Sequence, residues 1–264
     1  GFLHLFTKYT GVRELYWNKS VDGRTWTEDQ KLAGMGGHYQ SSRQLGDKIV
    51  TAFNMHIEGV PDTRTNLYFA QTTDMGDSWQ TITGEPIETP MVDRHCNALV
   101  RDFEAEGRMV YMKDINFDHN GNPVILVVTA ADYPAGPASD PRIFTVVHWN
   151  GSQWDYHEVT RTTHNYDMGS LYVEHDAWRI IAPTEPGPQY HGCGGEMATW
   201  LSKDEGKSWE KTRQLTADSP RNHAYARRPV NAHPDFYAFW ADGNPDEFSE
   251  SHLYFCNRDG DVWE

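Results

Sequence analysis

The sequence predicts an all-β protein assembled from repeated antiparallel sheets. Two observations carry this prediction: a short turn motif recurs along the 264 residues, and strand-like segments lie between its copies. Self-similarity at a spacing of roughly 50 residues is typical of repeat architectures. No stretch longer than a turn or two shows helical periodicity. A chain of this length is able to bury a large core as one domain.

The motif consists of Ser, Thr or Asn, one further residue, Asp, a Gly and then Trp. Its copies cover residues 20–26, 72–79, 202–209 and, more loosely, 257–263, with a degenerate form at 149–154. The Asp side chain accepts hydrogen bonds from backbone N–H groups that follow it, and Gly supplies the positive φ of a tight turn. The motif is therefore expected to join strands within a repeat, as structure rather than as a functional site.

Strand-like segments precede three copies of the motif and fill the intervals between copies. They are 14–17, 48–53, 66–70, 109–112, 124–128, 179–182, 197–200 and 235–240. Each is rich in β-branched and aromatic residues, as strands are. Counted from the motif, they predict repeats at about 1–30, 31–90, 91–163, 164–216 and 217–264, with the first repeat incomplete and the last lacking its outer strand.

The motif resembles the Asp-box of bacterial-neuraminidase repeats, and the resemblance covers nearly the whole chain. It implies a β-propeller of four-stranded blades around a central axis, with about five blades visible in a single domain, 1–264. Radial repetition of this kind hides sheet edges. Five blades could close into a ring. We favour part of a seven-bladed propeller, incomplete at its N-terminus, because Gly1 leads straight into a strand without a signal peptide.

Composition limits the classes of molecule that the protein is expected to bind. A net charge of −15 argues against nucleic acid and anionic membranes, whose phosphates are bound by Lys and Arg. An acidic polysaccharide stays open, because a local cationic funnel can sit on an acidic body. The three cysteines, Cys96, Cys193 and Cys256, are far apart and show neither metal-ligand spacing nor a disulfide framework.

Polar residues gather just before the expected first strand of four successive blades, where a propeller opens to its ligand. These segments contain His38, His95, His164 and His223. Four histidines in register indicate either a metal site or an acid–base site. A metal would need three or four ligands converging at about 2 Å, and no short-range pair supports one. We therefore expect no metal and no other cofactor.

Further candidates lie on the strands and loops that follow. Asn54 and His56 are two residues apart and so share one face of a strand. Lys113 is expected at the matching place in the next blade, on its second strand. Arg64 either reaches the mouth or pairs with Asp62. The predicted substrate-binding residues are Asn54, Arg64, Asn97, Lys113, Tyr190, Glu196, His223, Arg227 and Arg228. For the loop that carries Tyr190 and Glu196, a plain connector is an equal interpretation.

A closer resemblance rests on the runs 38–39, 64–68, 95–100, 164–172 and 227–230. They resemble propeller polysaccharide lyases that act on uronate polymers, such as ulvan lyases and rhamnose-glucuronate lyases. This resemblance implies β-elimination, in which a base removes the proton α to the uronate carboxylate and an acid protonates the leaving 4-oxygen. Cationic or amide groups hold the carboxylate as charge develops on it. The predicted catalytic residues are His38, His56, His95, His164 and Tyr166.

The roles within this set follow from the same resemblance. Those lyases carry paired histidines on one blade, which His38 and His56 approximate, but this chain has His95 and Lys113 where the family has Tyr and Arg. We expect His38 or His95 as base and Tyr166 or His164 as acid. Arg228, Arg227 or Lys113 would clamp the carboxylate. The resemblance also implies a secreted or periplasmic monomer that binds an acidic polysaccharide or oligosaccharide.

Other functions stay open at this point. A sialidase would share the motif but needs an arginine triad and a Tyr–Glu pair, and the usual Arg-Ile-Pro segment is absent. A glycoside hydrolase needs two carboxylates about 5–9 Å apart, for which Asp114, Asp167 and Glu196 are candidates. A lectin-like propeller would use the same histidines and aromatics to bind sugar without chemistry.

Overall fold

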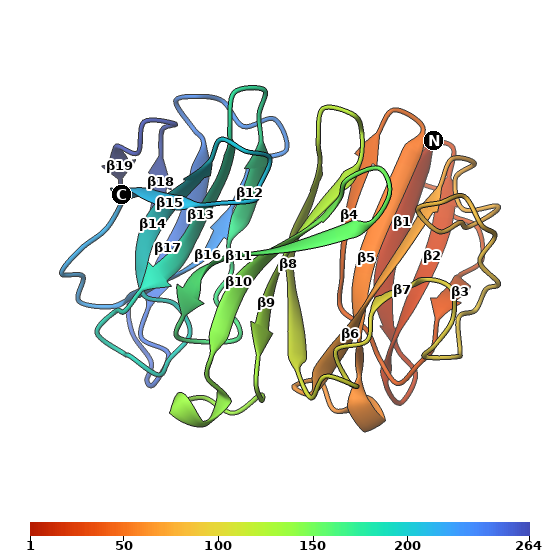
Figure 1. Cartoon of the computed structure of the whole chain (residues 1–264), viewed down its shortest axis with the longest axis horizontal. Coiled ribbons are helices and arrows are strands. Elements are labelled where there is room, and N and C mark those ends of the chain that lie inside the picture. The colour runs from red at the N-terminus through yellow and green to blue at the C-terminus, as the bar shows by residue number, and fades with distance from the viewer. The chain divides into compact units, whose positions relative to one another are not determined.

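The computed structural model describes every residue from 1 to 264. Apart from two short 3₁₀ turns, η1 (Ile57–Gly59) and η2 (Pro137–Ser139), its regular structure consists of β-strands arranged in five antiparallel sheets (Figure 1). The chain divides into two compact units, Gly1–Met112 and Lys113–Glu264, which are described separately. No helix is long and apolar enough to span a membrane.

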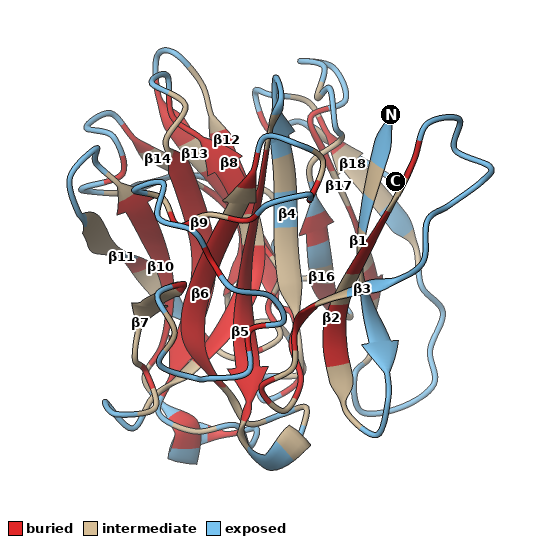
Figure 2. Cartoon of the chain, turned by 90° about the vertical axis from the view of Figure 1, so that its right-hand side faces the viewer, coloured by how far each residue is buried: buried red, intermediate tan, exposed pale blue.

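The first unit contains a three-stranded and a four-stranded sheet. The strands of the first are β1 (Phe2–Tyr9), β2 (Arg13–Ser20) and β3 (Gln30–Ala33), and those of the second are β4 (Gln40–Leu45), β5 (Lys48–His56), β6 (Arg64–Thr72) and β7 (Leu99–Arg101). Figure 2 shows β5 and β6 almost entirely buried. Leu15, Trp17, Phe53, Tyr68 and Trp79 form one apolar core in this unit. Burial of these large side chains supplies the main driving force for its folding.

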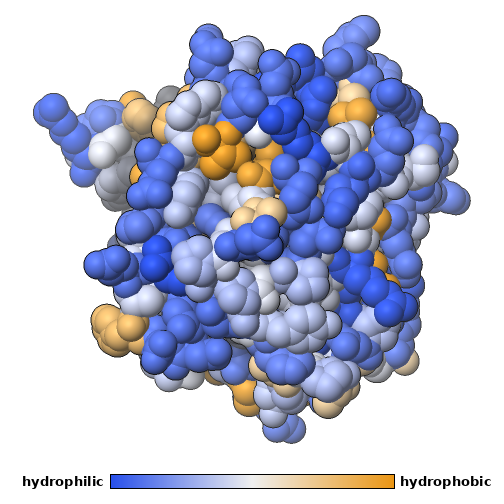
Figure 3. Space-filling model, turned by 90° about the vertical axis from the view of Figure 1, so that its left-hand side faces the viewer, coloured by the Kyte–Doolittle hydropathy of each residue, from blue (hydrophilic) through white to orange (hydrophobic).

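The second unit contains three four-stranded sheets. Their strands are β8 (Met109–Phe117, which begins in the first unit), β9 (Pro123–Ala130), β10 (Arg142–Trp149) and β11 (Trp154–Thr162), then β12 (Ser170–Val173), β13 (Trp178–Glu185), β14 (Glu196–Ser202) and β15 (Glu210–Gln214), and finally β16 (Asn222–Arg227), β17 (Ala238–Gly243), β18 (Leu253–Cys256) and β19 (Val262–Trp263). All residues of β9 are buried, which explains its unbroken apolar run. Figure 3 shows a largely hydrophilic face of the molecule, in keeping with the net charge of −15.

The recurring turn motif joins strands within one sheet, and it does so through local hydrogen bonds. In the second sheet, Thr72 Oγ1 accepts the N–H of Gly76 at 2.9 Å, and Asp74 Oδ1 accepts the N–H of Ser78 at 2.9 Å. Gly76 has φ +86°, and the ring of Trp17 lies 3.0 Å from where its Cβ would be. The copy at 202–209 repeats both hydrogen bonds at the same distances. Glycine is required here by conformation and by close packing.

One boundary between repeats differs from the expectation. The sequence placed a new blade at about residue 91, so that the strand after His95 would open it. Instead that strand is β7, which pairs with β6 through Leu67 and Tyr68 and completes the second sheet. The third sheet begins with β8, so Lys113 lies on a first strand rather than a second one. The three-residue β7 follows a long irregular segment. Because neither that segment nor β7 has a periodic pattern, the sequence did not reveal that β7 belongs to the second sheet.

Side chains also tie neighbouring strands of different sheets together. In the first unit, Asn54 Nδ2 donates to the Val110 carbonyl at 3.0 Å. In the second, Asn116 Nδ2 donates to the Leu171 carbonyl at 3.0 Å, and Ser170 Oγ donates to the Ala226 carbonyl at 2.9 Å. These bonds satisfy buried carbonyls of β8, β12 and β16, the first strands of their sheets.

Candidate functional site

Cationic and aromatic side chains gather at one end of the β5–β6 hairpin in the first unit. This cation–aromatic cluster consists of Arg13, Tyr39, His56, Arg64 and Tyr111. Register places Arg64, the first residue of β6, opposite His56, the last residue of β5. The Arg64 guanidinium lies 4.2 Å from the ring centre of Tyr39 and 5.2 Å from that of Tyr111, while Arg13 lies 5.9 Å from Tyr39. These distances are those of cation–π contacts.

His56 is the unusual member of the cluster. Its side chain is buried, its ring centre lies 5.0 Å from that of Tyr39, and neither ring nitrogen has a hydrogen-bond partner in the protein. Burial, reinforced by the nearby Arg64, lowers the pKa of His56 to about 3, so the ring is neutral at pH 7. A buried polar group without a partner costs roughly 1–3 kcal/mol. A group of this kind calls for an explanation, such as a functional role, local strain or a bound water.

The close contact between the backbone at position 37 and the His56 ring requires a glycine. Gly37 has φ +129°, and a Cβ at this position would lie 2.7 Å from Nδ1 of His56. The His56 N–H donates to the Gly37 carbonyl at 2.9 Å, so the two backbones are held together. Any larger residue at Gly37 would therefore push against the imidazole.

His38, predicted as a catalytic base, is fully engaged in the fold. Its Nε2 accepts the Met35 N–H at 3.1 Å, and its Nδ1 bonds to the Asn54 carbonyl at 2.8 Å. The ring is completely buried, and burial lowers its pKa to about 4. This structure leaves no ring nitrogen of His38 free to remove a substrate proton, which corrects the expectation.

Asn54 and the histidine expected next, His95, also have other partners. Asn54 is buried, and its Oδ1 accepts the Tyr39 N–H at 3.0 Å while Nδ2 bonds to Val110, so it acts as a brace. His95 precedes the edge strand β7 with its side chain exposed, and its Nδ1 lies 3.7 Å from Asp102. Asn97 Nδ2 donates to the Pro86 carbonyl at 2.9 Å. Asn54 contacts the cation–aromatic cluster only through the backbone N–H of Tyr39, and the contacts of His95 and Asn97 lie outside the cluster.

In the second unit, His164 and Tyr166 lie on the loop between β11 and β12, together with Asp167. Asp167 is fully buried and accepts hydrogen bonds from Thr162 Oγ1 at 2.5 Å, the His164 N–H at 2.9 Å and the Gly194 N–H at 2.6 Å. Burial raises the pKa of Asp167 to about 6. The neutral His164 ring accepts the Tyr166 N–H at Nδ1. Burial, followed by the charges of Arg142 and Lys113, lowers the pKa of His164 to about 4.

The cations predicted to clamp a carboxylate have differing environments. Lys113 is buried and its Nζ donates to the Asn165 carbonyl at 2.7 Å. Arg228 Nη2 lies 3.3 Å from Asp114 Oδ2, which also accepts the Leu171 N–H at 2.9 Å. Arg227 is exposed beside Tyr225. Lys113 and Arg228 are thus held by protein groups, and Arg227 points to solvent.

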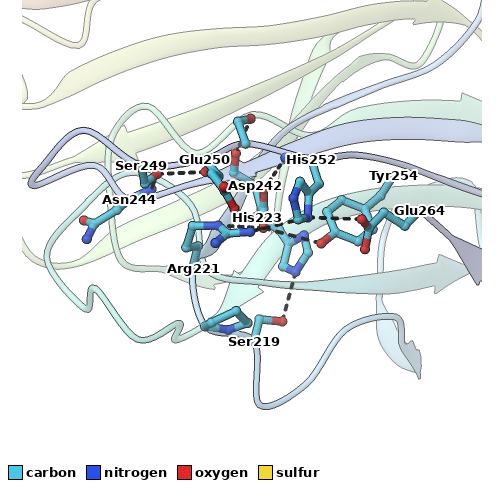
Figure 4. Close-up of polar contacts among 12 residues, drawn as sticks. Ser219, Arg221, His223, Asp242, Asn244, Ser249, Glu250, His252, Tyr254 and Glu264 are labelled. Carbon is cyan, nitrogen blue, oxygen red and sulfur yellow. Dashed lines mark hydrogen bonds and ion pairs between the residues drawn. The ribbon is translucent and has the colours of Figure 1, made fainter.

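His223, on β16, is linked through Ser219 to Glu196 on β14; Figure 4 shows His223 and Ser219. The indole N–H of Trp240 donates to His223 Nδ1 at 2.9 Å, and an indole can only donate. The proton of the neutral ring is therefore on Nε2, which donates to Ser219 Oγ at 2.9 Å. Ser219 Oγ in turn donates to Glu196 Oε2 at 2.9 Å. His223 cannot act as a base toward Ser219 in this tautomer.

The same figure shows a neighbouring ion pair at the ends of β16 and β17. Arg221 Nη2 lies 2.9 Å from Asp242 Oδ2, and Asp242 Oδ1 accepts the His252 N–H at 2.6 Å (Figure 4). Tyr190, on the loop between β13 and β14, is exposed, and its ring packs edge-on against His191 at 5.0 Å. Neither feature assembles an open catalytic arrangement.

Arg13, Tyr39 and Tyr111 were not among the site residues predicted from the sequence. Tyr39 follows directly after His38, and alternate residues of an extended chain point to opposite sides. The stronger chemical signal of the histidine therefore drew attention to the residue that faces inward. Arg13 and Tyr111 join the cluster from β2 and β8, far away in sequence, and no local pattern marks them.

Comparisons with known proteins agree with this architecture. Residues 9–162, more than half of the chain, match the model of a family described as BNR repeat-containing family member. An ulvan lyase of polysaccharide lyase family PL25 superposes with a TM-score of 0.78 at 18% identity, over 97% of this chain and 61% of that one. The structure of such a lyase bound to -[GlcA(1-4)Rha3S]- gives 0.79, with the same identity and coverage.

A protein of unknown function from Dyadobacter fermentans DSM 18053 superposes with a TM-score of 0.57 at 18% identity, over 94% of this chain and 69% of that one. A search of curated proteins gives no match. The chain spans about three-fifths of the length of the ulvan lyase structures. At these identities the likeness shows the fold class that the sequence predicts, a β-propeller, here with one three-stranded and four four-stranded sheets. With the match over residues 9–162, the chain belongs to the BNR repeat-containing family.

Proposed function

We propose that the protein is a carbohydrate-active propeller that cleaves an acidic polysaccharide by β-elimination, with the cation–aromatic cluster as its uronate site. The single observation that carries this proposal is His56, a buried, neutral imidazole without a partner, beside Arg64 and Tyr39. A neutral imidazole can accept a proton, and arginines bind carboxylates in bidentate fashion. Aromatic rings suit the apolar faces of sugars.

The roles follow from the chemistry of the cluster. Arg64 and Arg13 would hold the uronate carboxylate as charge moves onto it, and His56 would remove the proton from the adjacent carbon. The bond from the neighbouring carbon to the leaving 4-oxygen then breaks, a carbon–carbon double bond forms, and Tyr39 would protonate that oxygen. Tyr39 thus takes the role for which the sequence offered Tyr166 or His164.

The low pKa of His56 is consistent with this role once substrate binds. Arg64 and Arg13 help to lower it in the free protein. A bound carboxylate would neutralise these charges, and the pKa of His56 would rise toward the range in which a base is effective. We propose that a protein with this activity works outside the cytoplasm, secreted or periplasmic, where polysaccharides are encountered.

The test is the ultraviolet absorbance of the unsaturated uronate, recorded with a panel of uronate polysaccharides. We expect His56→Asn to lower kcat by about 100-fold or more, since general bases contribute roughly 10²–10⁴-fold. His95→Asn is the matched control, because His95 is exposed and outside the cluster, and it should keep full activity. Equal activity of the wild type and His56→Asn would refute the assignment of the base.

A second candidate is sugar binding without chemistry. It is favoured by the same low pKa of His56, because a base that weak transfers protons poorly unless binding raises its pKa. Binding measured by calorimetry, with no unsaturated product and no new reducing ends, would support it. Hydrolysis is less well supported, because Asp114 is paired with Arg228, Asp167 is saturated by three donors, and Glu196 accepts from Ser219.

A further inference from the structure

Three potential metal ligands converge in the second unit, outside the proposed uronate site. His164 and Asp167, on the β11–β12 loop, and Cys193, on the β13–β14 loop, each offer one ligand atom, and these atoms lie within 4.8 Å of one another. Asp167 is fully buried, and the other two are half-buried. Cys193 lies too far along the chain from the other two for any spacing motif to reveal the set.

The surroundings hold these groups in place. The carboxylate of Asp167 is oriented by the Thr162 hydroxyl and by the N–H groups of His164 and Gly194. Gly194 has φ +92°, and a Cβ there would lie 2.5 Å from the His223 carbonyl, so the residue after Cys193 is fixed against β16. Asn222 Nδ2 also donates to the Cys193 carbonyl at 3.2 Å. Supporting bonds of this kind orient ligands in metal sites.

We propose that His164, Asp167 and Cys193 bind a zinc ion, with a water molecule completing four ligands. A set of one imidazole nitrogen, one thiolate sulfur and one carboxylate oxygen suits zinc. Calcium and magnesium prefer oxygen ligands alone, and copper(I) prefers several sulfurs. This proposal goes beyond the proposed function and does not depend on it.

Zinc binding would displace the proton of the Cys193 thiol, because a metal is bound by the thiolate. In the metal-free protein, His164 Nδ1 accepts the Tyr166 N–H at 3.1 Å. Zinc bound at Nδ1 would replace this hydrogen bond. Zinc bound at Nε2 would leave the ring proton on Nδ1, which then could not accept it. The ion would in return join two loops that now meet through hydrogen bonds.

Cobalt(II) is the probe of choice, because a thiolate ligand gives it an intense ultraviolet charge-transfer band. We expect metal-free full-length protein to bind one cobalt ion per chain with this band, and zinc to displace it. Cys193→Ser should abolish the band. Cys96→Ser is the matched control, since Cys96 is also half-buried but lies in the first unit, and it should retain the band.

A second measurement needs no variant and guards against misfolding of Cys193→Ser. Alkylation of Cys193 in the wild-type protein, followed by mass spectrometry, should slow by at least about tenfold when zinc is added, because the bound thiolate is no longer a free nucleophile. The rate for Cys96 should not change. No charge-transfer band, a band that survives Cys193→Ser, or equal alkylation of Cys193 with and without zinc would overturn the proposal.

Discussion

The cation–aromatic cluster of the first unit and the loop cluster around Asp167 in the second both place a histidine among buried polar groups, but they satisfy those groups differently. Asp167 accepts three hydrogen bonds from its own and a neighbouring loop. His56 has no hydrogen-bond partner, and the groups around it are guanidinium and aromatic rings. The first cluster thus leaves a buried polar group unmet, which costs free energy, whereas the hydrogen bonds of the second hold loops together.

The largest effect that we expect from the first cluster is on the pH dependence of the free energy of unfolding. The unfolded chain binds a proton on His56 below pH 6.5, but the folded protein binds it only near pH 3. The unfolded state therefore takes up more protons as pH falls through this window, and stability falls by about 1.4 kcal/mol per pH unit for this residue. His56→Leu should lose this part of the slope. Urea unfolding of both proteins between pH 6.5 and 4 measures it, and parallel slopes would show that His56 titrates normally.

Asp167→Ala tests the loop cluster. Removing a fully buried carboxylate that accepts three hydrogen bonds leaves donors unpaired and a small cavity, so we expect the free energy of unfolding to fall by about 3 kcal/mol. Denaturant melts in the presence of a chelator separate this effect from metal binding. Asp246→Ala, at an exposed carboxylate, is the control and should change stability by less than about 0.5 kcal/mol. Equal effects of the two substitutions would contradict a structural role for Asp167.

At pH 7 we expect a smaller difference in stability between variants of His38 and of His56. His38→Leu should cost about 2 kcal/mol, because it strands the Met35 N–H and the Asn54 carbonyl. His56→Leu removes a group that has no partner and should be neutral or stabilise the fold by up to about 1 kcal/mol. Thermal unfolding of the two variants side by side checks the order. If His56→Leu is the more damaging, the imidazole has a structural partner after all.

Much of the fold was predictable because its signals are local. The turn motif closes hydrogen bonds within four residues, as between Asp74 and Ser78, so a short stretch of sequence reveals it. The boundary after the second sheet was not predictable, because β7 is three residues long and follows an irregular segment. For the candidate site, the sequence identified histidines as candidates but could not predict where their rings point. His38 and His56 both fit the pattern, and only tertiary contacts show that one is saturated and the other is not.

The side-chain bonds between sheets have a consequence for how such a chain is assembled. Asn116 donates to a carbonyl of β12, and Ser170 donates to a carbonyl of β16, so the third sheet is bonded to the fourth and the fourth to the fifth. Coupling between neighbouring sheets allows the chain to fold sheet by sheet, from the N-terminal side onward, as the polypeptide leaves the ribosome. Each newly completed sheet would serve as the template surface for its successor.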